Sequence, residues 1–346
     1  MKRYVLIILC ILAFISIYYS QTLESLENKI RSVKDKALST LASHQLASGE
    51  FPMEVCGERL GNSWCKNDST PVFTAYVLYA LNVLKDDPQV KDLAAKSVRF
   101  LKSESVDGLI WRSTTSQSGA QNLRPDIVDQ SNGNVLPDFD TTSLVSLALE
   151  MFDQAPANQE VFNKHRNQDG LLYLWHKQTS GEQNQEIDCG TVANSLTYLK
   201  NNDVTSCQYL YSFLDSGNSC SLYYDNGIIL DYLTVRAWEK NQNCFDNDFK
   251  NLILQRIISR KKTNNSYGND METALSISTL LRLGYETQKV EKSIEWLISQ
   301  QGSEGLWQRQ ELYHFSAPHE TYYTYGAKEL TTAFALEALA LYEKAL

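Results

Sequence analysis

Two kinds of helical segment alternate along the chain. In the first kind, a short run of acidic, amide or hydroxyl residues leads directly into a segment that is apolar on every face. Helices of this kind are buried inside a large fold, and these segments are too short to cross a bilayer. They are expected at Val72–Leu84, Asp138–Leu149, Val192–Leu199, Ile228–Trp238, Ala274–Leu283 and Ala333–Leu341.

The second kind of segment is amphipathic. In Leu23–Gln45, for example, Leu26 and Ile30 fall on one side while Glu27 and Lys29 fall on the other, which is typical of a surface helix. Val90–Leu101, Phe249–Ile258 and Val290–Ile298 repeat this pattern, and Asn158–Lys164 and Val204–Leu214 show it with a broken apolar stripe.

This alternation predicts an all-α (α/α)6 toroid, with six apolar helices in an inner ring and six amphipathic helices in an outer ring. Leu23–Gln45 is then the outer partner of the last inner helix. Little β structure is expected, and only as short extended pieces in the aromatic runs Leu222–Tyr224 and Thr321–Tyr325. Because no low-complexity linker interrupts residues 22–346, we expect them to form a single domain.

The first residues predict export. Met1–Arg3 is basic and Tyr4–Tyr19 is apolar, which is typical of a secretory signal peptide over residues 1–20. An uncleaved signal anchor, which would hold a lumenal protein on a membrane, is the alternative. Either way the remaining chain is expected in the secretory pathway or outside the cell.

The cysteines agree with an oxidising compartment. Without Cys10, six of the seven cysteines are left, an even number. In a toroid, Cys207 and Cys220 flank an outer helix and so lie at opposite faces, too far apart for a bond. The predicted bridges are Cys56–Cys65, Cys189–Cys220 and Cys207–Cys244, and glycosylation sequons begin at Asn67 and Asn264.

Charge and motifs narrow the function classes. With 32 basic and 41 acidic residues the chain has a formal charge of −9, which argues against a nucleic-acid partner. It has no P-loop, dinucleotide-binding glycine fingerprint or His-Glu-x-x-His motif. No cofactor is expected. Charge and motifs do not exclude an isoprenoid, a glycan or a protein as the partner.

The turns after several outer helices share a glycine followed closely by an aromatic residue, as in Gly108–Trp111 and Gly305–Trp307. Together with the Asp-x-Asp-x-Thr sequence of residues 138–142, this pattern resembles the squalene-cyclase and prenyltransferase repeat superfamily, and within it most of all the class II terpene cyclases. The resemblance covers nearly all of the chain after the signal segment. It implies the toroid fold and a small apolar, isoprenoid-like substrate.

The resemblance also implies a catalytic acid. Asp140 takes the position of the carboxylic acid that protonates an alkene in class II cyclases, and Asp138 lies ahead of it. Thr141 stands where a further acidic residue is usual, and the second toroid domain that normally completes the cavity in those enzymes is not expected here. Asp188 and Glu272 begin other inner helices, so they are further candidate catalytic residues that could face the same mouth of the central cavity as Asp140. Carboxylates crowded there would raise each other's pKa. The structural alternative is that Asp140 is only an N-cap.

Asp231 and Arg236 place charges inside an apolar helix, where a charge must be paired or face a polar cavity. Their spacing of five residues argues against a bond between them. Arg236 is expected either to bind an anionic headgroup or to form a salt bridge with a neighbouring helix. Aromatic candidates that would stabilise a carbocation, or simply fill the core, are Tyr76, Trp175, Tyr232 and Tyr322.

The chain lacks the residues needed for two other activities of this superfamily, thioester formation and zinc-dependent prenyl transfer. Cys56-Gly57-Glu58-Arg59 has Arg59 where a thioester motif has glutamine. Asp188-Cys189 with His314 or His319 is spaced wrongly for a prenyltransferase zinc site, so no metal is expected.

The main functional hypothesis is therefore a terpene-cyclase-like enzyme that protonates a linear isoprenoid through an aspartate. One alternative is a secreted glycan-active (α/α)6 enzyme, in which Asp140 and either Glu272 or Asp188 would lie about 5 to 10 Å apart across a groove. The other is a non-catalytic toroid that binds lipid or protein.

Overall fold

The computed structural model describes residues 26–346 apart from 60–61, 116, 119–134, 177–185, 217–219, 247 and 318–320. The predicted signal segment at residues 1–20 lies outside the described residues. None of the helices that the structure describes combines the length and apolar character needed to cross a membrane.

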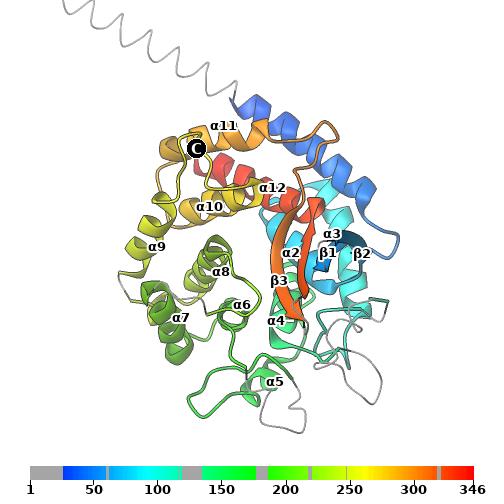
Figure 1. The fold of residues 1–346 in the computed structure, drawn as a ribbon, viewed down its shortest axis with the longest axis vertical. Coiled ribbons are helices and arrows are strands. Elements are labelled where there is room, and N and C mark those ends of the chain that lie inside the picture. The colour runs from blue at the N-terminus through cyan, green and yellow to red at the C-terminus, as the bar shows by residue number, and fades with distance from the viewer. Residues whose placement is uncertain are drawn as a thin grey trace, which may run out of the picture.

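Within the described residues, six buried helices form a closed inner ring (Figure 1). Each helix packs against the next, and the last packs against the first. Every residue of the first helix is buried; its N-cap is Thr70, and Pro71 stands at a helical start where its missing N–H costs nothing. The ring comprises α2 (Pro71–Leu81), α4 (Phe139–Met151), α6 (Cys189–Leu199), α8 (Gly227–Lys240), α10 (Asp270–Arg282) and α12 (Lys328–Ala345).

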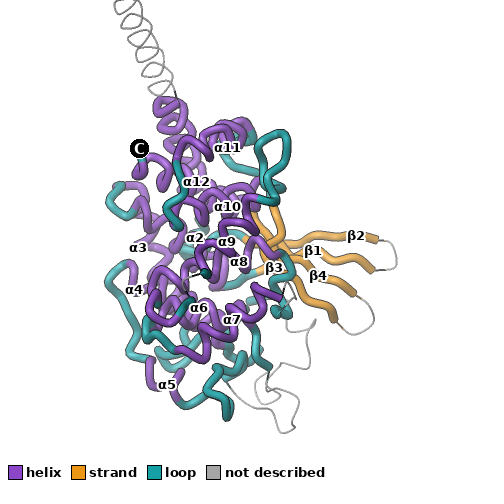
Figure 2. The backbone as a smooth tube through the Cα atoms, turned by 90° about the vertical axis from the view of Figure 1, so that its left-hand side faces the viewer, coloured by secondary structure: helices purple, strands orange, loops and turns teal. Residues whose placement is uncertain are grey.

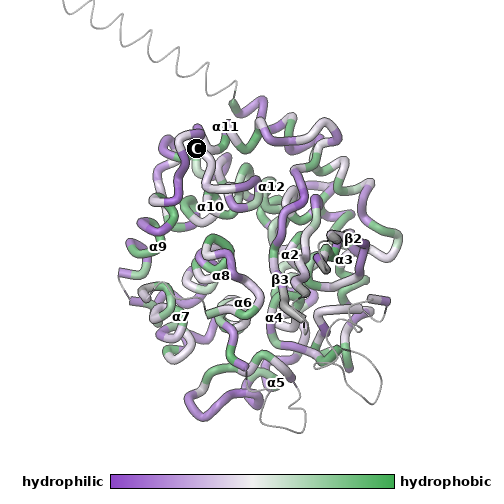
Figure 3. The backbone as a smooth tube through the Cα atoms, in the orientation of Figure 1, coloured by the Kyte–Doolittle hydropathy of each residue, from purple (hydrophilic) through white to green (hydrophobic). Residues whose placement is uncertain are grey.

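Amphipathic helices surround this ring, and Figure 3 shows how their polar residues lie toward the outside. The helix over residues 26–44 packs beside α12, where Lys34 pairs with Glu343 and His44 Nδ1 lies 2.7 Å from Glu329 Oε1. The described outer helices thus confirm the predicted (α/α)6 toroid. The others are α3 (Pro88–Ser103), α5 (Gln159–Asn163), α7 (Val204–Ser216), α9 (Phe249–Ile258) and α11 (Thr287–Ser299), with short 3-10 turns η1 (Asn82–Leu84) and η5 (Gln242–Cys244).

Four turns that join an outer helix to the next inner helix share one hydrogen bond, from the backbone N–H of an aromatic residue to a threonine hydroxyl of the inner helix. Trp307 donates its backbone N–H to Thr332 Oγ1 at 3.1 Å and its indole N–H to the Leu297 carbonyl at 2.7 Å. Gly305 adopts the positive φ of 99° that lets the chain turn back here. Equivalent backbone bonds join Trp111 to Thr142, Phe51 to Thr74 and Tyr267 to Thr273.

In the described part of the chain, four antiparallel strands form a sheet in the order β2-β1-β4-β3, which projects from one face of the helical ring (Figure 2). The prediction of only short extended pieces underestimated the β structure, because Thr321–Tyr325 is part of a full strand in this sheet. The other predicted piece, Leu222–Tyr224, is not a strand. The sheet exists because ring closure places the hairpin before α12 beside the hairpin before α2. The strands are β1 (Met53–Arg59), β2 (Asn62–Asp68), β3 (Gln310–Ala317) and β4 (Thr321–Ala327).

All three predicted disulfides are confirmed. Cys56–Cys65 joins β1 to β2, and Cys207–Cys244 joins α7 to the turn after α8. Cys189–Cys220 fastens the segment that leads into α8 to the start of α6. The helix-pair geometry therefore identified the correct partners.

Replacing Thr332 with valine tests the turn-to-helix hydrogen bond. The substitution keeps the side-chain shape but leaves the buried Trp307 N–H without its acceptor. We expect the free energy of unfolding to fall by about 1–3 kcal/mol, as measured by urea denaturation. Thr263→Val, at an exposed loop position, should change it little; equal losses in both variants would contradict the assigned role.

Candidate functional site

The starts of several inner helices meet at one face of the ring. Asp188, which begins α6, accepts bonds from the Leu222 N–H and the Ser221 hydroxyl, both at 2.7 Å, in the segment before α8. Asn226, which begins α8, donates to Glu272 in the first turn of α10 at 2.5 Å. The acidic helix starts are thus gathered at a common mouth.

Most of the carboxylates at this mouth cap helices. Asp138 is the N-cap of α4 and accepts from the Thr141 N–H at 2.7 Å and the Thr141 hydroxyl at 2.9 Å. Asp188 caps α6 by accepting from the Thr191 N–H at 3.1 Å, and Glu272 forms a capping box with Asn269 in α10. The interpretation of Asp140 as an N-cap was wrong, because the cap of its helix is Asp138, two residues earlier.

Asp140 instead takes part in a hydrogen-bond network built from four segments. Asn194 of α6 donates to Asp140 Oδ1 at 2.7 Å, and the Tyr224 hydroxyl donates to Oδ2 at 2.7 Å. Tyr76 of α2 completes the network, with its hydroxyl 3.1 Å from that of Tyr224 and 3.4 Å from the Asn194 amide. Tyr76, Asn194 and Tyr224 are buried, whereas Asp140 keeps some accessible surface.

Burial makes the two aspartates at the start of α4 weak acids. Burial, together with the nearby Asp188 carboxylate, raises the pKa of Asp140 to about 6 against the opposing effect of the Asn194 hydrogen bond. Burial, followed by the charge of Asp140, raises the pKa of Asp138 to about 7. Both groups therefore hold protons more readily than ordinary carboxyls do.

Strand β3 borders the same network. The Tyr313 ring stacks on Phe73 of α2 at 5.8 Å and meets Tyr224 edge-on at 6.3 Å. The His314 N–H donates to the Tyr223 carbonyl at 3.0 Å, so β3 runs beside the segment that carries Tyr224. Aromatic rings from both the helical ring and the sheet thus border the network that holds Asp140.

A second cluster lies on the other side of Tyr76. The guanidinium carbon of Arg236 in α8 is 3.4 Å from the centre of the Tyr79 ring, 5.5 Å from Tyr232 and 5.9 Å from Tyr76. Arg236 is fully buried, and within the described residues its three nitrogens have no hydrogen-bond partner. As expected, it does not pair with Asp231, which binds Arg256 of α9 and Arg260 in the turn after α9 instead.

Charges next to this cluster are balanced. Glu337 of α12 is fully buried and accepts from the Tyr232 hydroxyl at 2.7 Å and from Arg282 at 2.5 Å. Arg282 also bonds Glu239 at 2.6 Å. Arg236 and Arg282 thus lie near Glu337 and Glu239. The opposite charges limit the free-energy cost of burying each group.

The structure separates the predicted substrate residues. Arg236, Tyr76 and Tyr232 lie together in the centre of the ring. Trp175 packs in a small separate cluster with Val135, Leu136 and Leu174, and its indole N–H donates to Glu186. Tyr322 is 41% exposed on β4 and stacks on His314.

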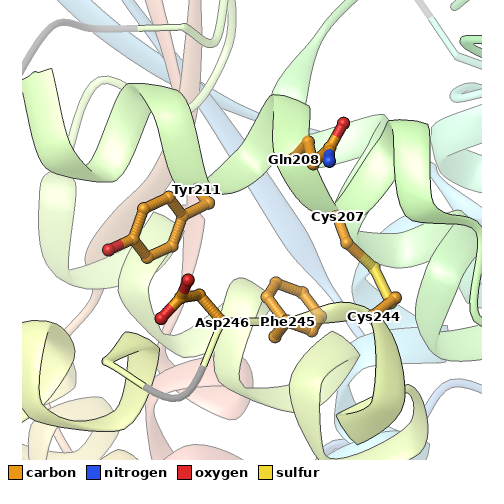
Figure 4. Close-up of a pocket in the computed structure, with 6 residues that line it drawn as sticks. All are labelled: Cys207, Gln208, Tyr211, Cys244, Phe245 and Asp246. Atoms are coloured by element: carbon orange, nitrogen blue, oxygen red, sulfur yellow. A yellow bond between two sulfur atoms is a disulfide. The ribbon is translucent and has the colours of Figure 1, made fainter.

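Two surface depressions lie away from the ring centre. One, of about 260 Å³, lies beside the Cys207–Cys244 bond, between α7 and the segment after α8 (Figure 4). The other, of about 210 Å³, lies on the sheet beside Cys56–Cys65 and Tyr322. Neither contains Asp140.

The residues of the loose zinc pattern are used differently. Cys189 is bonded to Cys220, and His314 Nδ1 lies 3.4 Å from Asp225 Oδ2. His319 falls outside the described residues. Among the side chains that the structure describes, no three histidine, cysteine, aspartate or glutamate residues form a metal-binding group.

Sequence reasoning missed Asn194, Tyr224 and Glu337. Asn194 and Glu337 are polar residues inside apolar helices, the signal that drew attention to Asp231 and Arg236. Tyr224 gave no such signal, because it precedes α8 in an irregular segment.

Comparisons with known proteins agree on the fold. No family model matches the chain, and no curated protein matches it either. A variant of the type II terpene cyclase MstE from Scytonema, solved with its substrate geranylgeranyl dihydroxybenzoate, superposes with a TM-score of 0.65 at 14% identity, covering 93% of this chain and 100% of that chain. The ent-copalyl diphosphate synthase from Streptomyces platensis gives a TM-score of 0.58 at 14% identity, over 79% of this chain and 50% of that chain. The chain therefore has a terpenoid cyclase-like fold.

The raised pKa values predict how stability depends on pH. The folded pKa values of Asp140 and Asp138 lie above the value of about 3.9 in an unfolded chain. Their stabilising contribution is therefore complete below that value and is lost as pH rises through about 6 to 7. The unfolding free energy of wild type should therefore fall between about pH 4 and pH 8. In Asp140→Asn this fall should be smaller by about 1–3 kcal/mol.

Urea denaturation across this pH range measures the effect. Asp153→Asn, at an exposed position, is the matched control and should keep the wild-type pH dependence. An Asp140→Asn curve parallel to wild type would mean that Asp140 titrates normally.

Proposed function

We propose that this chain is a terpene-cyclase-like enzyme, in which Asp140 protonates a linear isoprenoid. The observation that carries the proposal is the position of Asp140: it begins an inner helix without capping it, and it is held by Asn194 and Tyr224. The fold, which this chain has in common with type II terpene cyclases, adds support.

Protonation of an alkene requires a carboxylic acid that stays neutral until it reacts. Burial and the neighbouring Asp188 carboxylate both raise the pKa of Asp140 and so favour its neutral form. When the proton leaves, Asn194 and Tyr224 are already placed to donate to the new carboxylate. Desolvation thus favours the protonated acid, and its conjugate base is stabilised by donors that do not need to move.

The reaction balances without a cofactor. Asp140 gives its O–H proton to one carbon of the terminal double bond, which forms a C–H bond and leaves a carbocation on the other carbon. The next double bond attacks this cation and closes a ring. Loss of a proton to water from a carbon next to the final cation then gives a cyclic alkene, and Asp140 regains a proton from solvent, so no oxidant or reductant is consumed.

In this proposal the other acidic residues act through Asp140. Asp138 fixes the start of α4, and Asp188 holds the Tyr224 segment while its charge raises the pKa of Asp140. Glu272 fixes α10 against α8. We assign them as positioning residues.

The proposed substrate is an apolar prenyl chain. MstE was solved with geranylgeranyl dihydroxybenzoate, which carries such a chain. Tyr76 would contact it beside Asp140, and Tyr232 and Arg236 would bound its inner end. The glycan-active alternative needs a second free carboxyl, whereas Asp188 and Glu272 are both occupied as caps.

We also propose that the protein is secreted. The three disulfides are compatible with an extracellular protein, and the proposed glycosylation sites Asn67 and Asn264 are both exposed.

Asp140→Asn tests the chemistry, because an amide cannot supply the proton. Purified protein would be incubated with farnesyl and geranylgeranyl alcohols, their diphosphates and prenylated phenols, and products identified by gas or liquid chromatography with mass spectrometry. We expect wild type to form a cyclic isomer of at least one compound, and the variant to form it at least about 100-fold more slowly.

Asp153→Asn supplies the same change of charge at an exposed site and should keep wild-type activity. Equal rates for Asp140→Asn and wild type would remove Asp140 from the mechanism. Binding of these compounds without any isomerisation would favour the non-catalytic lipid-binding alternative.

A further inference from the structure

Side chains from opposite walls of the ring meet on its axis. In the closed order α2-α4-α6-α8-α10-α12, helix α8 lies opposite α2. Arg236 nevertheless reaches from α8 to within 3.4 Å of the Tyr79 ring centre on α2. The Tyr79 ring also meets Tyr232 of α8 at 6.5 Å in a perpendicular arrangement. The bore of the ring is therefore bridged at this level.

This bridge is closely packed. Arg236 is fully buried, and Tyr79 and Tyr232 are only 5% and 1% exposed. Phe334 of α12 packs against both tyrosines, with ring centres 6.0 Å from Tyr76 and 5.6 Å from Tyr232. Asp140, on the mouth side of Tyr76, keeps accessible surface. The accessible part of the bore therefore lies on the mouth side of the bridge.

The bridge also carries a fixed positive charge. Aromatic ring faces attract cations, and in this chain Arg236 already occupies the faces of Tyr79, Tyr232 and Tyr76. A second cation at the same faces would be repelled by the guanidinium. The rings that would otherwise attract a positively charged ligand are thus taken by a cation of the chain itself.

We infer that Arg236, held by Tyr79, determines specificity by closing the bore: it excludes long apolar chains and positively charged groups from the part of the ring beyond Tyr76. The limit on chain length rests on the proposed function, because it assumes a prenyl ligand. The resident-cation site itself does not.

The first experiment is independent of the substrate. Arg236→Ala vacates the aromatic faces, so tetramethylammonium should raise the thermal midpoint of this variant in a saturable manner and leave wild type unchanged. The uncharged isostere tert-butanol should have no such effect on either protein. No saturable shift with tetramethylammonium, or an equal shift with tert-butanol, would overturn the cation site.

A less disruptive variant keeps the cation site testable if Arg236→Ala does not fold. Arg236→Val removes the charge and fills only the space next to α8, so the Tyr79 face stays open. If Arg236→Ala does not fold, Arg236→Val should show the tetramethylammonium shift on its own, and its absence would again overturn the site.

The second experiment measures the chain-length limit. Binding of geraniol, farnesol and geranylgeraniol would be followed by calorimetry. In an open apolar bore each added isoprene unit should tighten binding by at least about tenfold. We expect this gain to stop within the series for wild type and to continue for Arg236→Ala. Equal gains in the two proteins would overturn the limit.

The two failures can be told apart. If none of the three alcohols binds either protein, the proposed function fails, and the tetramethylammonium experiment alone decides whether Arg236 is a resident cation. If the alcohols bind with equal gains while tetramethylammonium shows its saturable shift, the proposed function stands and the closure of the bore does not.

Discussion

In four inner helices, α2, α4, α10 and α12, the rotation of the helix about its own axis depends on one hydrogen bond, between the backbone N–H of an aromatic turn residue and a threonine hydroxyl. Thr142 accepts this bond in α4, so that side of the helix faces the turn and the outer ring. A residue two positions away lies roughly 200° around the helix, and Asp140 therefore points to the ring centre. The same offset of two residues relates Thr74 to Tyr76 in α2 and Thr332 to Phe334 in α12.

Most of the fold could be predicted from the sequence, because the pattern of apolar and polar residues along a helix shows whether it is buried on all faces or on one face. Phe249–Ile258 was located to the residue. The sheet was missed although Met53, Val55 and Gly57 are buried in alternation with less buried residues, a period-two pattern over too few residues to stand out. Strand β2 is polar and has almost no pattern, since its pairing with β1 depends on the turn and on Cys56–Cys65.

The site was predictable in position more than in detail. Asp138 and Asp140 are both good N-cap residues, and only the observed hydrogen bonds show that the first caps the helix and the second does not. Partners such as Tyr224 come from segments far away in the chain, where periodicity carries no information. Arg236 illustrates the same limit: the sequence required an explanation for a buried charge, but it did not indicate that the explanation was a tyrosine face across the ring.

Tyr224 reaches Asp140 from an irregular segment whose position is held in part by Cys189–Cys220. A newly made chain, before this bond has formed, possesses the acidic residue but lacks the tether that brings the phenol to it. If Asp140 is the acid, as proposed, formation of this disulfide also completes the group that donates the proton. An oxidising compartment would then do more than stabilise the fold, because the chain would stay inactive until the bond has formed.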